Sequence, residues 1–453
     1  MTQKPLASAL RRGVAACAVM ISLTGVAGAE PFAATGDFDG RIGASGPDRG
    51  PILAGGTAQI QARGLAPNQP VTLRQGGETL EGGPFSADDA GELAASITIP
   101  EGAAPGIYPV VVELGGEAAS ATILDLKVST DPGDVNAEAY EQQSAEVATR
   151  PYQVASGDGA LFVTSAVGRP PVKESELVKL DPETLEPIAR VSPEAAPARE
   201  DGSDGGLFAV YGIGLAPGQV WVTNTRQDTV AVYSSEDLSL VKQFAPGTVP
   251  HSRDVVHHDG KVYVTATFEP TVHVFDVDSL EELEPIMLES GRRGQDFATA
   301  SLSLAPEAGK LFVSSLRSEE VAVVDLDTGE ETAVWQVPGS ANTIGIAASP
   351  DGSRVYTVAQ GNDAISVLDG ASGELLNQAN VGANPLNAVV DPATGHVYVA
   401  MRGNAAVAVL DADGTLVANL KGNATPNHLT VDDAGRVYVV DQSTGSLTRI
   451  VAK

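Results

Sequence analysis

The sequence has few of the residues on which several common protein functions depend. Its 453 residues include a single cysteine, Cys17, so the chain offers no disulfide framework, no cysteine-based zinc site and no attached c-type haem. Lys and Arg number 28 against 58 Asp and Glu, and this excess of negative charge disfavours binding to nucleic acid or anionic membranes. Motifs of serine hydrolases, zinc proteases and phosphate-binding loops are absent, so these activities have no local support.

The first 29 residues predict export. A cationic start precedes an apolar run, and Ala27 and Ala29 supply the small-residue spacing of a signal-peptide cleavage site. We expect cleavage before Glu30, which removes Cys17 and three basic residues and changes the formal charge from −30 to about −33. No later run approaches the roughly 18 consecutive apolar residues of a membrane-spanning helix. The sequence therefore predicts a periplasmic or secreted protein with no transmembrane segment after processing.

A short β-branched phrase with an aromatic core recurs seven times in the last two thirds of the chain. Its aromatic residues are 40 to 59 positions apart: Phe162, Trp221, Tyr263, Phe312, Tyr356, Tyr398 and Tyr438. In each repeat a run of small residues precedes the phrase, and a second apolar run with an Asp and Gly turn follows it. Four short strands in this spacing are typical of one β-propeller blade, so the sequence predicts an all-β fold with a seven-bladed β-propeller over residues 138–453.

The last repeat lacks a fourth strand. It ends at Lys453, directly after its third strand, whereas the segment 138–150 precedes the first repeat without belonging to it. We expect this segment to complete the last blade and to close the ring without a covalent link.

The region before the propeller follows different rules. Residues 50–129 alternate short apolar runs with Gly and Pro turns and show no helix signal, which predicts a small β-sandwich. Residues 30–49 and 130–137 are predicted as linkers.

The repeats resemble the YVTN family of β-propellers. The stretches "GANPLNAVVDPATGHVYVAMRGNAAVAVLDADG" (382–414) and "GSANTIGIAASPDGSRVYTVAQGNDAISVLDGASG" (339–373) match its repeat, and the first blade resembles the exported YncE-like branch. In the sandwich, "RGLAPNQPVTL" and "PEGAAPGIYPVVVEL" resemble bacterial immunoglobulin-like modules. The resemblance implies a binding protein, with occasional links in the family to nucleic acid or to metal uptake.

Two recurring features raise the question of metal binding. Pairs such as Asp276 with Asp278 and Asp325 with Asp327 recur in equivalent hairpins, where turn formation explains them better than calcium binding does. His251 and His428 both stand at the start of a first strand, but in blades on opposite sides of the ring. We therefore predict no metal and no cofactor.

The predicted binding site lies on one face of the propeller. The loops between second and third strands and those between blades should emerge together, and eight of the thirteen propeller arginines fall near them. Alignment on the turn after the first strand superposes Tyr152, Tyr211, Arg253, Ser301, Gly345, Asn387 and His428 at the channel mouth. Arginine can hold a carboxylate or phosphate through two hydrogen bonds, and tyrosine offers a flat apolar surface. The predicted binding residues are Arg253, Arg292, Arg293, Asn387, His428, Tyr152, Tyr211, His251, Arg317 and Arg402.

These observations favour a non-enzymatic protein that binds an anionic small molecule or a protein partner. Two alternatives stay open. A propeller enzyme of the lactonase or metal-dependent hydrolase type would need carboxylate, Asn or His ligands at the axis, of which the superposed ring offers Asn387 and His428. A single-stranded nucleic-acid binder would need more basic and aromatic side chains than this chain has.

Overall fold

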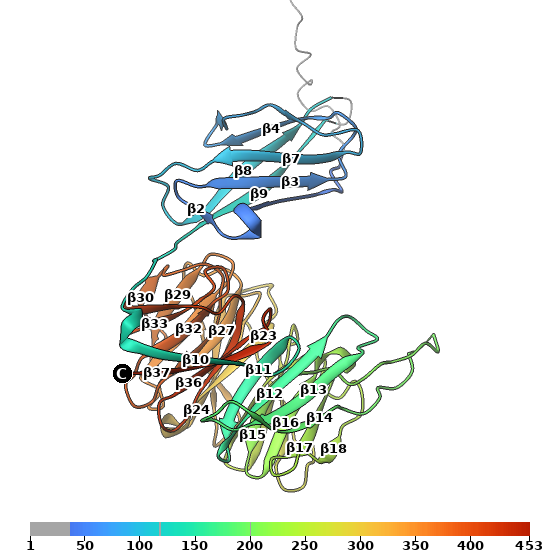
Figure 1. Ribbon diagram of the computed structural model, residues 1–453, viewed down its shortest axis with the longest axis vertical. Coiled ribbons are helices and arrows are strands. Elements are labelled where there is room, and N and C mark those ends of the chain that lie inside the picture. Colours follow the sequence, from blue (N-terminus) through green and yellow to red (C-terminus); the bar gives the residue numbers. More distant parts are fainter. Residues whose placement is uncertain (1–36, 117–118, 200) are drawn as a thin grey trace, which may run out of the picture.

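The computed structural model describes residues 37–116, 119–199 and 201–453, which form two β-rich lobes (Figure 1). The predicted signal peptide, residues 1–29, lies outside the described residues. Within the described part, no helix has the length and apolar character needed to cross a membrane. The only helical segments described are four short 3-10 turns: η1 (Pro47–Arg49), η2 (Ala137–Ala139), η3 (Thr225–Gln227) and η4 (Pro306–Ala308).

The smaller lobe is a sandwich of two sheets. One sheet has the order β1 (Arg41–Ser45), β3 (Thr57–Arg63), β7 (Glu92–Thr98). The other has the order β2 (Ile52–Leu53), β9 (Ser120–Ser129), β8 (Gly106–Leu114), β4 (Pro70–Gln75), β5 (Glu78–Thr79), with β6 (Phe85–Ser86) also paired to β4. Alternate side chains such as Ala58, Ile60 and Ala62 of β3 are buried between the sheets, as the period of a half-buried strand requires.

The sandwich begins earlier than its sequence predicts. Strand β1 pairs antiparallel with β3, from Arg41 opposite Arg63 to Ser45 opposite Gln59. The prediction of a linker over residues 30–49 is therefore wrong for residues 41–45. The sequence of this strand, RIGAS, includes one Gly and one Ala and shows no clear alternation of apolar and polar side chains. A strand could therefore not be recognised from it.

The larger lobe consists of seven four-stranded antiparallel sheets, which confirms the predicted propeller. Blades one to three are β11 (Pro151–Gly157), β12 (Ala160–Val167), β13 (Glu174–Leu180), β14 (Pro187–Val191); β15 (Val210–Ala216), β16 (Gln219–Asn224), β17 (Thr229–Ser234), β18 (Leu240–Gln243); and β19 (Ser252–His258), β20 (Lys261–Ala266), β21 (Thr271–Asp276), β22 (Ile286–Met287). Blades four to six are β23 (Thr299–Ala305), β24 (Lys310–Ser315), β25 (Glu320–Asp325), β26 (Glu331–Gln336); β27 (Thr343–Ala348), β28 (Arg354–Ala359), β29 (Ala364–Asp369), β30 (Leu375–Ala379); and β31 (Pro385–Val390), β32 (Val397–Met401), β33 (Ala406–Leu410), β34 (Leu416–Lys421).

The seventh blade joins the two ends of the propeller. Its strands are β35 (Pro426–Val431), β36 (Val437–Asp441), β37 (Ser446–Ala452) and, on the outside, β10 (Tyr140–Glu146). Strand β10 pairs antiparallel with β37 over its whole length, from Tyr140 opposite Ala452 to Glu146 opposite Ser446 (Figure 1). The predicted closure of the ring by the segment 138–150 is confirmed.

The core of the propeller lies between blades. Each of the seven aromatic residues of the repeated phrase is at most 2% exposed and packs in a cluster shared by two adjacent blades. Trp221 of β16, for example, contacts Phe244 and Phe275, at ring-centroid distances of 5.9 and 5.5 Å. Strands this short cannot bury a face alone, so the blades depend on one another for stability.

Candidate binding site at the mouth of the central channel

The first strands of the blades surround the channel. Their pairing register with the second strands determines at which level of the channel each polar side chain lies. In each blade, one residue of the first strand pairs with the equivalent position of the second strand. These residues are Val154, Ile213, Val255, Leu302, Ile346, Ala388 and Leu429. The residues directly before them therefore lie at one level of the channel. This level consists of Gln153, Gly212, Asp254, Ser301, Gly345, Asn387 and His428.

The superposition predicted for Tyr152, Tyr211 and Arg253 is therefore wrong by one residue. The hairpin between first and second strands has two connecting residues in blades one to three, as in Gly157 opposite Ala160, but four in blade four, where Ala305 pairs with Lys310. When the repeats are aligned on this turn, the difference in hairpin length shifts the first-strand residues of blades one to three by one position relative to the other blades. Gln153 and Asp254 were missed for this reason, and counting back from the aromatic phrase could have found them.

Four of the predicted site residues line a single pocket of about 180 Å³ at the mouth of the channel, here called the mouth pocket. These are Tyr152, Arg253, Asn387 and Arg402, and Gln360 and Gln442 lie beside them. Gln360, Arg402 and Gln442 follow second strands, whereas the others stand at the beginning of first strands. The pocket thus lies on the face that carries the loops after second strands and the connections between blades.

The two arginines of the mouth pocket differ in their partners. Arg402 donates a hydrogen bond from Nη2 to Oε1 of Gln442 at 3.1 Å, and burial lowers its pKa. The side chain of Arg253 is 17% exposed, and its Nε has no hydrogen-bond partner among the described residues. Its nearest counter-charge is Oδ1 of Asp254, 4.0 Å from Nε. A half-buried guanidinium with unused donors is a receptor for an anion, because its five N–H groups match carboxylate or phosphate oxygens.

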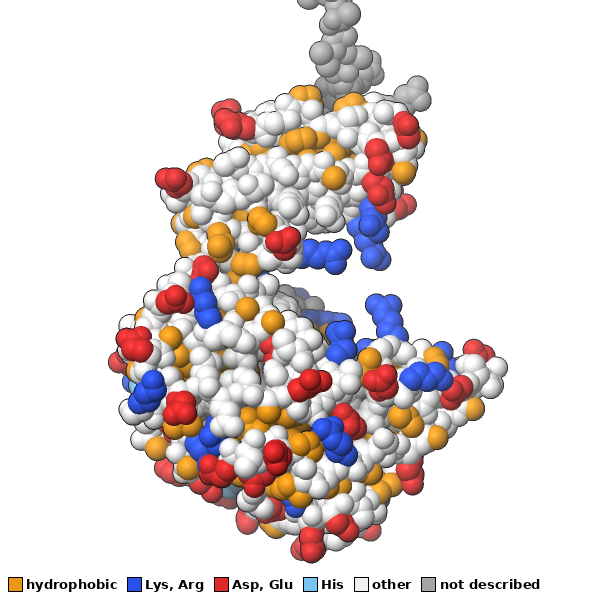
Figure 2. Space-filling model, viewed as in Figure 1, with side chains coloured by type: hydrophobic (Ala, Val, Ile, Leu, Met, Phe, Trp, Pro, Cys, Tyr) orange, Lys and Arg blue, Asp and Glu red, His pale blue; other side chains and the backbone are white. Residues whose placement is uncertain are grey.

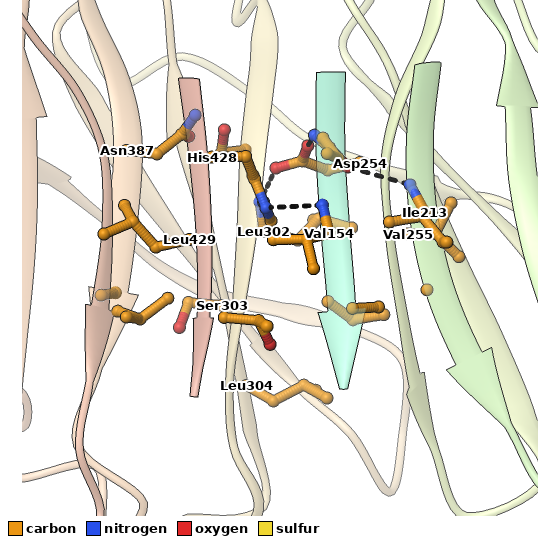
Figure 3. A pocket seen from close by; sticks show the side chains of 18 of the residues that line it. Val154, Ile213, Asp254, Val255, Leu302, Ser303, Leu304, Asn387, His428 and Leu429 are labelled. Carbon is orange, nitrogen blue, oxygen red and sulfur yellow. Dashed lines mark hydrogen bonds between the residues drawn. The ribbon is translucent and has the colours of Figure 1, made fainter. Parts of the chain in front are cut away.

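Below the mouth pocket the channel widens into a cavity of about 410 Å³, here called the channel cavity, which shares Gln153 and Asn387 with the pocket. Asn387, His428 and Asp254 lie around its upper end (Figure 3). Asp254 accepts hydrogen bonds from Gln153 Nε2 at 2.8 Å and from the Leu302 backbone amide at 3.4 Å. His428 accepts one at Nδ1 from the Val154 amide at 3.4 Å, and burial lowers its pKa to about 4.

The other predicted residues lie around the mouth pocket rather than in it. Tyr211 packs edge-to-face against Tyr152 with ring centroids 4.9 Å apart. Arg226, one of the eight arginines that the sequence places near this face but not one of the predicted binding residues, stacks over Tyr211 at 5.7 Å. His251 and Arg317 pack separately against Phe268, at 5.3 and 5.2 Å from its ring centre.

The arginines predicted to be central beside Arg253 do not reach the pocket. Arg292 donates to the Ser318 carbonyl and to Oε2 of Glu319, the latter at 2.9 Å. Arg293 is exposed in the same connection between β22 and β23 and does not line the pocket. An exposed pair of this kind contributes little to stability, and the acidic partner of Arg292 already neutralises it.

The sandwich docks on the same face of the propeller. Lys127 of β9 forms a 2.7 Å ion pair with Asp363, and it also donates to the Gln360 carbonyl and the Asn384 side chain. Ser129 donates to the second oxygen of Asp363. Lys and Arg side chains lie on both sides of the hollow between the lobes (Figure 2), and on the sandwich three arginines line one depression: Arg41, Arg49 and Arg63.

The repeated acidic hairpins contain the predicted turn hydrogen bonds. Oδ1 of Asp276 accepts from the amides of Asp278 and Ser279, and Oδ1 of Asp325 accepts from those of Asp327 and Thr328. These amides lower the pKa of both carboxyl groups. Within residues 37–116, 119–199 and 201–453, no three His, Cys, Asp or Glu side chains are grouped so that they could hold a metal ion.

Solved structures similar to this chain are propeller proteins of different functions. Hydrazine synthase from Kuenenia stuttgartiensis has a TM-score of 0.55 at 15% identity, covering 68% of this chain and 96% of that one. Virginiamycin B lyase from Staphylococcus aureus has a TM-score of 0.53 at 12% identity, covering 69% and 99%. For U3-55K the values are 0.54, 11%, 70% and 99%. At these identities the likeness concerns the fold alone. No family model and no curated protein sequence matches the chain.

Proposed function

We propose that this chain is an exported, YncE-like binding protein that holds a small anion in the mouth pocket of its propeller, with an immunoglobulin-like sandwich beside that pocket. Export rests on the signal-peptide pattern of residues 1–29, and the two family assignments rest on the sequence resemblances described above. The observation that carries the binding role is the pair Arg253 and Arg402, which line one pocket although the chain as a whole is strongly acidic.

Both arginines of the mouth pocket have hydrogen-bond donors that no described residue uses. Arg402 donates one hydrogen bond to Gln442, and Arg253 makes none to a described residue. Burying a charged donor without a partner costs free energy, which an incoming carboxylate or phosphate would recover through charge-assisted hydrogen bonds. Asn387 and Tyr152 add a polar and an aromatic contact at the pocket's edge. Sites with a few convergent polar groups in a concavity are the usual form of small-molecule sites.

The test compares two arginines of the same face. Protein is purified from the periplasmic fraction of a bacterial host, where processed chains should begin at Glu30. Binding of acetate, propionate, lactate, malonate and inorganic phosphate is measured by ligand-observed NMR titration. Arg253→Gln should weaken binding of the preferred anion at least tenfold, because it removes a charge-assisted hydrogen bond. Arg293→Gln should leave the affinity unchanged.

Two results would contradict the proposal. One is that none of the five anions binds the unmodified protein, and the other is that the two substitutions weaken binding equally. Melting temperatures of both variants, compared with that of the parent protein, exclude a general loss of folding as the cause.

A further inference from the structure

We infer that the ligand of the mouth pocket is a small monocarboxylate that carries a hydrogen-bond donor, a hydroxyl or ammonium group, on the carbon next to its carboxylate, and that Asp254 accepts that donor. This inference rests on the proposed anion binding and specifies the chemical class of the ligand.

The charged groups of Arg253 and Asp254 lie close to each other. Arg253 and Asp254 are consecutive residues, with Nε and Oδ1 4.0 Å apart. Arg253 lines the mouth pocket and Asp254 lines the channel cavity directly below, and the two spaces share Gln153 and Asn387. One small molecule can therefore contact the guanidinium and the carboxylate at once, with its carboxylate above and its donor below.

The carboxylate of Asp254 has unused acceptor capacity. An ionised carboxylate offers about four lone-pair sites. Asp254 uses one for Gln153 Nε2 at 2.8 Å and another for a long bond of 3.4 Å from the Leu302 amide. Its side chain is 13% exposed, and it lines the cavity. The amide of Gln153 is fixed in this orientation because its Oε1 accepts from the Ile213 amide at 2.9 Å. Asp254 thus presents an acceptor to the cavity at this level, and this acceptor favours a ligand that carries a donor.

The charged side chains around the two spaces give the site a net positive charge. Arg253 and Arg402 contribute two positive charges and Asp254 one negative charge, which leaves one positive charge. The next charged groups around Arg402 are Arg150 and Asp441, which have opposite signs. A hydroxy acid, as a monoanion, neutralises this site, whereas an amino acid places its carboxylate at the arginines and its ammonium group at Asp254, so each of its charges meets an opposite one. The second carboxylate of a dianion would approach Asp254, and like charges in close contact are unfavourable.

The size of the mouth pocket limits the ligand further. Its volume of about 180 Å³ corresponds to about six water molecules at roughly 30 Å³ each. This is the range of a two- to four-carbon acid, with the channel cavity below available for a slightly longer chain.

The inference is tested by comparing the binding of three acids of similar size. Propionate, lactate and alanine differ only in the group on the second carbon: hydrogen, hydroxyl or ammonium. Their dissociation constants for the unmodified protein are measured by NMR titration at pH 7.5. Lactate or alanine should bind about tenfold more tightly than propionate, since one hydrogen bond to a charged acceptor corresponds to about that factor. Comparing lactate with alanine identifies which donor is preferred. Malonate, which adds a second carboxylate, should bind more weakly than either.

The matched variants are Asp254→Asn and Asp259→Asn, the latter an exposed residue just beyond the other end of the same strand. Asp254→Asn should reduce the preference over propionate to less than threefold, and Asp259→Asn should retain it. Equal binding of all three acids, abolished by Arg253→Gln, would overturn the inference and leave the proposed function standing. Tighter binding of malonate would also overturn it. If none of these acids binds, the inference fails, and the proposed function fails with it only if acetate and inorganic phosphate do not bind either. Should Asp254→Asn not fold, the comparison of the three acids on the unmodified protein decides alone.

Discussion

At the scale of single residues, the channel holds an uncharged histidine close to two opposite charges. His428 accepts a hydrogen bond from the Val154 amide and is enclosed by first strands of the ring. Burial lowers its pKa, Asp254 raises it and Arg253 lowers it, and the resulting pKa is about 4. A histidine that accepts at Nδ1 carries its proton on Nε2, so protonation at Nδ1 would require loss of the bond to Val154.

This arrangement predicts a specific loss of stability in mild acid. Because the folded pKa of His428 is about 4 and the ordinary value is 6.5, its contribution is fully present above pH 6.5 and is lost as the pH falls toward 4. Between pH 7.5 and pH 5 the unfolding free energy should fall by about 2 kcal/mol through this residue. His428→Gln should remove that part of the decrease, measured by urea unfolding at both pH values.

The control for this prediction is His258→Gln, at the last residue of β19, which should keep the decrease. Burial also lowers the pKa of His257 and His251, so a smaller pH dependence should persist in the His428 variant. An identical decrease in the His428 variant and in the unmodified protein would contradict the assignment.

At the scale of elements, a hydroxyl on the second strand connects adjacent blades. Thr265 of β20 accepts from the Asp254 amide in its own blade and donates to the Ala300 carbonyl in the next, both at 3.1 Å. Thr164, Thr223 and Ser314 occupy the same position in blades one, two and four and make equivalent bonds. The position is Val358, Ala400 and Val440 in blades five, six and seven. In blades six and seven, Asn387 and Asn427 donate to the next first strand instead.

The same substitution at two buried threonines distinguishes the contribution of these hydrogen bonds from the effect of burying a threonine. Thr265→Val removes both bonds and leaves a buried amide and a buried carbonyl without partners, so stability should fall by about 1–3 kcal/mol. Thr357 of β28 is also fully buried, but its hydroxyl has no hydrogen-bond partner among the described residues. Thr357→Val should therefore be neutral or slightly stabilising. Chemical denaturation measures both, and equal losses would contradict the role of the connection.

The sequence predicted elements better than their register. The seven aromatic phrases identify the blades because only a buried second strand repeats a large side chain at this period, and the unpaired segment 138–150 identifies the closing strand. The level of each residue along the channel depends on hairpin length, which a single loop can change. This is why the predicted ring contained Arg253 where the structure has Asp254. Arg402 was predicted from its loop alone, and its pairing with Arg253 in one pocket required the assembled ring.

At the scale of the whole molecule, the two lobes meet through a few polar contacts that local sequence patterns cannot reveal. Lys127 and Asp363 are 236 residues apart, and nothing in either segment marks them as partners. Their contact is nonetheless saturated: Asp363 also accepts from Ser129 and from the Asn384 amide. The connection after β9 is held to blade six, with Asn404 donating to the Thr130 carbonyl and Asn419 to that of Gly133. Because Gln360 lines the mouth pocket and accepts from Lys127, the sandwich is fastened directly beside the proposed site.

Removing the cation should release the sandwich. Asp363 is only 2% exposed, so Lys127→Met leaves a buried carboxylate without its counter-charge, and the lobes should separate at a cost of about 2–4 kcal/mol to the contact. Small-angle scattering should then show a larger radius of gyration, and proteases should cleave between residues 130 and 139. The matched control is Lys173→Met, whose 2.7 Å pair with Asp204 is about two-thirds exposed on both sides, so that its loss should leave stability nearly unchanged. Adding Asp363→Asn to Lys127→Met should restore part of the compact form, because the amide no longer buries an unpaired charge. A Lys127 variant as compact and as protease-resistant as the Lys173 variant would mean that the lobes are held together by the linker contacts alone.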